Sequence, residues 1–166
     1  MNAYVMADSK WGISKNGKHL ASIPAEQKTK WQDTMGKVIV YGAKHIPELL
    51  GQQPVAGSTN IIFTDGAKCN IKESSTVRVF DDLTSLRNAL SDYPENDIYV
   101  IDNEKLYREF FDDFKQIHVT KIDYCYEADS FFEDLDKHPE FVITRDSDEL
   151  YCFDIVYSFL LYERRK

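Results

Sequence analysis

The feature that most constrains the fold is the alternation of two apolar patterns along the first two-thirds of the chain. Short runs rich in β-branched and aromatic residues predict strands, and the stretches between them carry helix-forming residues at helical spacing. The expected strands are 3–7, 38–41, 60–64, 77–80 and 97–101. The expected helices are 25–35, 42–50, 82–90 and 103–111. Strands that alternate with helices are typical of a parallel α/β sheet.

The last third of the chain has a different pattern, in which strand follows strand. Long strands are expected at 116–124, 140–145 and 150–163, with no helix between them. Consecutive strands without a helical crossover pair in the antiparallel direction. The sequence therefore predicts one α/β domain over residues 1–166, with a mostly parallel sheet, antiparallel C-terminal strands and flanking helices. In such sheets, ligands bind beyond the carboxyl ends of the strands.

Composition limits the classes of function open to the chain. A length of 166 residues with 43% hydrophobic residues suits one domain with a sizeable core. The formal net charge of −8 argues against binding to nucleic acid or to anionic membranes by charge attraction. No apolar run reaches the roughly 18 residues that span a bilayer, and the first residues show no secretory signal. We therefore expect a monomeric cytoplasmic protein with a small-molecule ligand.

The three cysteines predict no disulfide and no metal site. Cys69, Cys125 and Cys152 are odd in number and far apart in the chain. No spacing of histidine, cysteine and carboxylate residues matches a known metal-binding pattern. Free thiols in a reducing compartment are the expectation.

Short patterns follow one another in a fixed order over nearly the whole chain. They are D-S-K-W-G-I-S-K-N-G at 8–17, I-P-A-E at 23–26, T-M-G-K-V-I-V-Y-G at 34–42, N-I-I-F-T at 60–64, I-Y-V-I with L-Y at 98–107, V-T-K-I-D with A-D-S-F-F at 119–132, and Y-S-F-L-L-Y-E-R at 157–164. Each pattern alone is weakly specific. Together, in this order and at this spacing, they resemble the dihydrofolate reductase family.

The resemblance implies a reaction in which a hydride passes from NADPH to dihydrofolate or a related pterin. In this reaction one carboxylate in an apolar pocket binds the pterin. The resemblance implies that Glu26 is this carboxylate and that Thr120 supports it. Residues matching the family's pterin and nicotinamide pocket are Met6, Ala7, Val55, Ile101 and Tyr107. Residues matching its cofactor site are Ile13, Lys44, His45, Thr64, Asp102, Asn103 and Glu104. Without the resemblance, Glu26 reads as a helix N-terminal residue that complements the helix dipole, and the apolar positions read as core.

Several positions depart from the family pattern, and they are positions that bind the cofactor or the substrate in the family. Asp102 and Asn103 replace a glycine pair beside the cofactor, Ala43 replaces an arginine for the phosphates, and Asp65 replaces a basic residue at the 2′-phosphate. The other departures are Lys30 for the aromatic that stacks on the pterin, Ser58 for the arginine that holds the folate carboxylate, Ser14 for a loop glycine, and His19–Ala21 for L-P-W. Weak or absent NADPH binding is therefore expected.

Two functions remain open on the sequence alone. One is a dihydrofolate reductase-like oxidoreductase with impaired activity, and the other is a non-catalytic member of the fold that serves in binding or as a scaffold. NADPH binding discriminates between them. We also expect a raised pKa for a buried Glu26, a trans peptide between Asp102 and Asn103, and capping of the following helix by Asn103.

Overall fold

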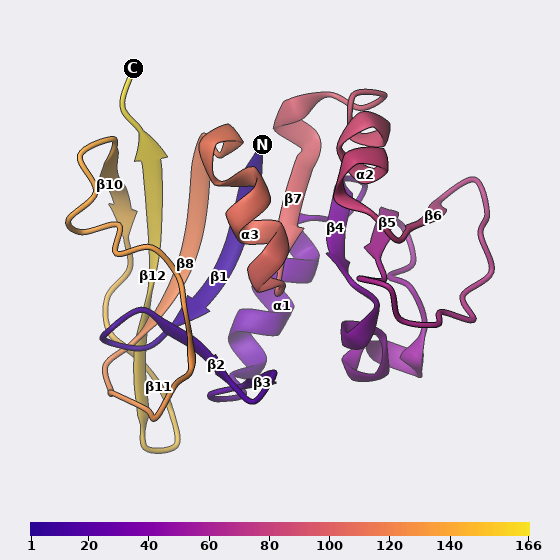
Figure 1. Cartoon of the computed structure of the whole chain (residues 1–166). Coiled ribbons are helices and arrows are strands. Elements are labelled where there is room, and N and C mark those ends of the chain that lie inside the picture. The colour runs from indigo at the N-terminus through magenta and orange to yellow at the C-terminus, as the bar shows by residue number, and fades with distance from the viewer.

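A single nine-stranded sheet crosses the molecule in the computed structural model, which describes residues 1–166 (Figure 1). The strand order is β10-β12-β8-β1-β7-β4-β5-β6, with β11 paired to β12. The parallel strands are β1 (Asn2–Ala7), β4 (Val38–Gly42), β5 (Thr59–Phe63), β6 (Val77–Phe80), β7 (Ile98–Ile101) and β8 (Gln116–Ile122). The antiparallel strands are β10 (Phe141–Asp146), β11 (Leu150–Cys152) and β12 (Ile155–Arg164). The predicted fold class is confirmed.

The other elements are three helices, a small sheet and four short 3-10 turns. The helices are α1 (Pro24–Asp33), α2 (Leu83–Leu90) and α3 (Glu104–Phe110). The small antiparallel sheet contains β2 (Gly12–Lys15), β3 (Lys18–His19) and β9 (Ser130–Phe131). The 3-10 turns are η1 (Ala43–Glu48), η2 (Leu50–Gln52), η3 (Glu95–Asp97) and η4 (Phe111–Asp113). None of these helices combines the length and apolar character needed to cross a lipid bilayer.

The alternation of side chains along each strand divides the core between the two faces of the large sheet. Helices α2 and α3 pack against one face, where Val5 and Val100 meet Phe110. The opposite face, which α1 covers behind the sheet in Figure 1, holds Tyr4 and Tyr41. The central strands β1, β4, β5 and β7 are buried on both sides because both faces are covered.

Two helices begin at the capping residues that the sequence predicts. The Asp82 carboxylate accepts a hydrogen bond from the Ser85 amide at the start of α2, at 2.7 Å. The Asn103 side chain accepts one from the Leu106 amide at the start of α3, at 3.0 Å. Each cap satisfies an amide that has no partner inside the helix.

Two predicted elements differ from the structure. Residues 42–50 form the 3-10 turn η1 instead of an α-helix, because Pro47 lies inside it and lacks the amide that an α-helix needs. The expected strand 150–163 is a hairpin, in which Cys152 pairs with Ile155 around a two-residue turn. Phe153 occupies this turn with φ of 54° and is fully exposed. A bulky residue is rare in this conformation, so the sequence gives no turn signal there.

Candidate functional site

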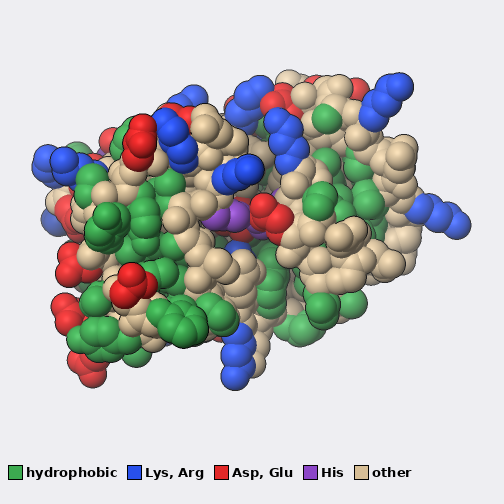
Figure 2. All heavy atoms as spheres, turned by 90° about the horizontal axis from the view of Figure 1, so that it is seen from below, with side chains coloured by type: hydrophobic (Ala, Val, Ile, Leu, Met, Phe, Trp, Pro, Cys, Tyr) green, Lys and Arg blue, Asp and Glu red, His purple; other side chains and the backbone are tan.

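A cleft of about 240 Å³ opens at the carboxyl ends of the central parallel strands. These ends lie at the lower edge of the sheet in Figure 1, and Figure 2 views this edge from below. Histidine and acidic side chains meet in its middle, with lysine or arginine side chains close by (Figure 2). Eight of the residues matched to the family's site line this cleft, namely Met6, Ile13, Lys44, His45, Asp102, Asn103, Glu104 and Tyr107.

The remaining matched residues lie outside the cleft. Glu26 and Thr120 line a second pocket of about 190 Å³, between α1 and strands β8 and β12. Ala7 and Ile101 are buried in the core. Val55 donates its amide hydrogen to the Asn60 side chain at 2.9 Å, and Thr64 donates its hydroxyl to the Phe80 carbonyl at 3.4 Å. These last four residues therefore shape the walls rather than face the cleft.

A buried ammonium group, that of Lys30, joins the two pockets. Its side chain is 2% exposed, and its Nζ donates to a carboxylate oxygen of Asp102 at 2.8 Å. The same Nζ lies 3.4 Å from a carboxylate oxygen of Glu26, one turn earlier on α1. Lys30 thus contacts two buried carboxylates with a single positive charge.

The pKa values of this group follow from burial and from the partners. Burial raises the pKa of Glu26, and the ammonium of Lys30 offsets only part of that rise, so the predicted direction is confirmed. Burial alone would lower the pKa of Lys30, but the two carboxylates outweigh it and raise the pKa. Burial would raise the pKa of Asp102, but Lys30 and His45 outweigh it and lower the pKa. Lys30 and Asp102 are therefore a charged buried pair, and protonation is favoured at Glu26.

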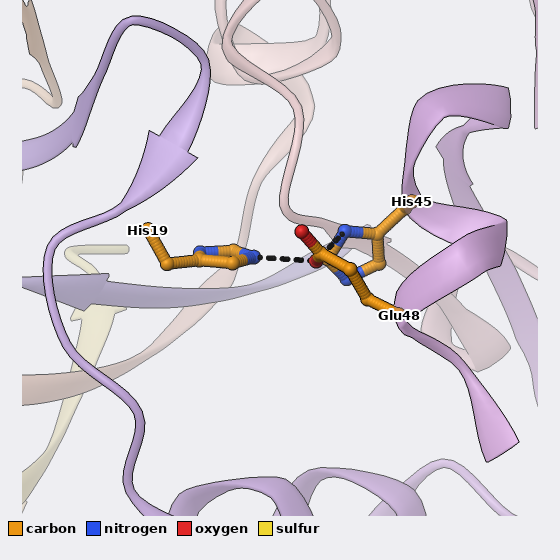
Figure 3. A group of neighbouring side chains, drawn as sticks. All are labelled: His19, His45 and Glu48. Carbon is orange, nitrogen blue, oxygen red and sulfur yellow. Dashed lines mark hydrogen bonds and ion pairs between the residues drawn. The ribbon is translucent and has the colours of Figure 1, made fainter.

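The chain of polar contacts continues from Asp102 to the mouth of the cleft. His45 Nε2 lies 2.8 Å from the Asp102 carboxylate, and His45 Nδ1 lies 3.0 Å from the Glu48 carboxylate. His19 Nε2 reaches the same Glu48 oxygen at 3.1 Å from the other side, as Figure 3 shows. Acidic and basic side chains thus alternate from the buried Glu26 to the exposed His19.

The turn between β7 and α3 is packed tightly against the end of β4. Asp102 has φ of 51°, and its amide donates to the Tyr107 hydroxyl at 2.7 Å. A Cβ atom on Gly42 would lie 2.6 Å from the Asn103 side-chain nitrogen, so a larger residue there would displace the Asn103 side chain. Every peptide bond is trans, so the prediction for the Asp102–Asn103 bond is confirmed.

The residues of the cleft do not fit the phosphates of NADPH. Glu48, Asp65, Asp102 and Glu104 all line the cleft and carry negative charge. Lys105 is paired with Asp65 at 2.7 Å, which leaves Lys44 as the lysine of the cleft without an ion pair. The Asn103 cap also occupies an amide at the start of α3 that an anion would otherwise bind.

Sequence reasoning assigned no binding role to His19, Lys30 or Glu48. The contact between Lys30 and Glu26 had a signal, because residues four apart lie on the same side of a helix. His19 and Glu48 had none, because they lie on separate elements, β3 and η1, that only the tertiary fold brings together.

Comparison of the sequence with protein families shows to which family the chain belongs. The family model for dihydrofolate reductase matches residues 1–164. A comparison with individual curated proteins gives no match. The match extends from β1 through β12 and so includes the whole sheet, both pockets and the residues between them. The chain belongs to the dihydrofolate reductase family.

Proposed function

We propose that this protein is a dihydrofolate reductase-like oxidoreductase in which NADPH-dependent reduction of dihydrofolate or a related pterin is impaired. Membership of the family supports the reaction class. We infer that the reaction is impaired because the ammonium of Lys30 lies between the Glu26 and Asp102 carboxylates. Glu26 is the residue we assign to pterin binding, with Thr120 nearby on the same pocket.

The Lys30 contact competes with a pterin for the same carboxylate. A pterin would donate its amino and ring N–H groups to Glu26, but the Lys30 ammonium already lies against that carboxylate. Displacing Lys30 would leave a buried ammonium with fewer partners. Loss of all its partners costs a buried charge roughly 3–5 kcal/mol, and because Lys30 would keep Asp102, loss of Glu26 alone costs less than this. Pterin binding in the family's manner is therefore expected to be weak.

The cofactor side adds a second penalty. NADPH carries several negative charges, and Asp65, Asp102 and Glu104 line the cleft that the family resemblance assigns to it. Like charges at short range disfavour binding. We expect a dissociation constant for NADPH above about 100 μM, which corresponds to a binding free energy weaker than about −5.5 kcal/mol.

A titration tests the proposal directly. Trp11 and Trp31 provide intrinsic fluorescence, and NADPH is added from micromolar to millimolar concentration, with reductase turnover on dihydrofolate measured alongside. We expect no saturation in the low micromolar range. Tight saturation together with turnover that Glu26→Gln abolishes would show an efficient reductase and overturn the proposed impairment.

A restored variant provides the matched comparison. Asp65→Arg combined with Asp102→Gly and Asn103→Gly removes negative charge and side-chain bulk from the cofactor side. This variant should bind NADPH more tightly than the unmodified protein. Restoring only the pterin side, with Lys30→Phe, should improve NADPH binding less.

The second candidate function is a non-catalytic scaffold. It is favoured by the closed chain of ion pairs, which fills the place of the reacting groups with contacts internal to the protein. No fluorescence response up to millimolar NADPH, with the fold intact by circular dichroism, would favour this alternative. Slow but measurable turnover that requires Glu26 would exclude it.

A further inference from the structure

Three potential metal ligands meet at the mouth of the cleft. His19 lies at the end of β3, and His45 and Glu48 lie three residues apart on η1 (Figure 3). One ligand atom from each lies within 4.8 Å of the other two. The Glu48 oxygen is 3.0 Å from His45 Nδ1 and 3.1 Å from His19 Nε2. Ligand atoms around a tetrahedral zinc ion lie about 3.3 Å apart, given metal–ligand bonds of about 2.0–2.1 Å.

The contact between His45 and Asp102 leaves the Nδ1 atom of His45 as a possible metal ligand. Its Nε2 atom lies 2.8 Å from the Asp102 carboxylate, which Lys30 holds in place. A histidine that binds a metal commonly donates its other ring N–H to a carboxylate, which fixes the tautomer and orients the ring. With its proton on Nε2, His45 presents the lone pair of Nδ1 towards Glu48. Two acceptors 3.0 Å apart attract only when a proton or a cation lies between them.

The outer two ligands are more exposed to solvent than His45. His19 and Glu48 are 32% and 50% exposed at their side chains, whereas His45 is 9% exposed. Rotation of the two exposed side chains adjusts the geometry without moving the buried network. All three residues line the cleft. A cation bound to them therefore has free coordination positions on the side that faces the cleft.

We propose that His19, His45 and Glu48 form a binding site for a divalent transition-metal cation of the zinc type. Two imidazoles and one carboxylate are a donor set typical of zinc sites that keep a position open for water or a small ligand. Magnesium and calcium prefer oxygen ligands throughout. This inference does not rest on the proposed reductase function, because it concerns a different ligand, although its residues line the same cleft.

Calorimetric titration with Zn²⁺ tests the proposal on the untagged full chain after removal of metals by a chelator. We expect one equivalent to bind. Titration with Co²⁺ should give the visible absorption of a tetrahedral site with nitrogen and oxygen ligands. Binding through Cys69, Cys125 or Cys152 would instead give a thiolate charge-transfer band and would contradict the proposed ligands.

Substitutions at the two exposed ligands complete the test. His19→Gln and Glu48→Gln should each weaken Zn²⁺ binding by about tenfold or more. The matched controls His138→Gln and Glu149→Gln alter residues outside the cleft and should bind Zn²⁺ as the unmodified protein does. Unchanged affinity in both ligand variants, or no binding by the unmodified protein, would overturn the proposal.

Discussion

Lys30 is the residue on which the buried polar group depends. Its ammonium is the only lysine or arginine group in contact with Glu26 and Asp102, and all three side chains are less than a tenth exposed. Lysine is rarely buried to this extent unless it is paired. At this residue, the chain therefore buries a charge that has to be balanced from within the protein.

Replacement of Lys30 by methionine, which has a similar length, should destabilise the fold. Lys30→Met leaves two buried carboxylates without their ammonium partner, and we expect a loss of about 3 kcal/mol or more in the free energy of unfolding. Urea denaturation monitored by circular dichroism measures it. Lys37→Met is the matched control, because Lys37 forms an ion pair with Asp97 at the surface and its loss should have little effect. Equal losses in the two variants would contradict the role given to Lys30.

Glu26 should make stability depend on pH. Burial raises its pKa above the usual 4.5 in the folded state. A carboxyl with a raised pKa contributes stability in its protonated form, which is present below pH 4.5 and lost as the pH rises through the folded value. Relative to Glu26→Gln, which stays neutral, the unmodified protein should become less stable as the pH rises from 4.5. Denaturation at several pH values measures this, and a constant difference would show that Glu26 titrates normally.

Among the elements, the β7–α3 turn is the one in which a single side chain, that of Asn103, connects a helix to a strand. Asn103 caps α3 and at the same time packs against Gly42 at the end of β4. A helix start and a strand end are thereby locked to each other at the edge of the cleft. This contact also fills space at the edge of the cleft, which both residues line.

A double-mutant cycle tests this coupling between the two elements. Gly42→Ala should cost about 1–3 kcal/mol, because the added methyl group meets the Asn103 side chain. Asn103→Ala should cost about 1 kcal/mol through loss of the cap. In the Asn103→Ala background, the penalty of Gly42→Ala should shrink, because the clashing atom is gone. Strict additivity of the two changes in unfolding free energy would argue against the contact.

The elements also show how far sequence reasoning reaches. The strands and α2 were predictable because apolar periodicity and capping residues are local signals, as at Asp82. The hairpin of β11 and β12 was not, because its turn is made by Phe153, whose left-handed backbone has no local cause. The family resemblance pointed to eight of the sixteen residues that line the cleft. It did not predict the ion pairs from Lys30 to His45, which depend on the folded arrangement of α1, η1 and the β7–α3 turn.

The whole molecule has features that oppose association through its sheet edges. At the β6 edge, the Val79 amide donates to the Glu73 side chain at 2.9 Å and is not free to pair with another strand. At the β10 edge, a bulge between Ile143 and Arg145 interrupts the register. Covered and irregular edges disfavour pairing between copies. The net charge of −8 adds repulsion between copies.

We therefore expect a monomer in solution. Sedimentation equilibrium at micromolar concentration and moderate salt should give the chain mass of 19.3 kDa. High salt screens the charge repulsion but leaves the edges covered, so the mass should not change. A mass of two chains that persists at low protein concentration would show that one of these edges, or another face, pairs.

The contact between His19 and Glu48 has a consequence for the speed at which molecules reach the cleft. It joins the β2–β3 hairpin to η1 across the opening and is exposed to solvent on both sides. When His19 is protonated, salt weakens this surface contact, because ions screen its charges. The association rate of a neutral molecule should therefore rise with ionic strength, the opposite of electrostatic steering. The access of ligands to the cleft then depends on the salt concentration, because the His19–Glu48 contact across its mouth has to break first.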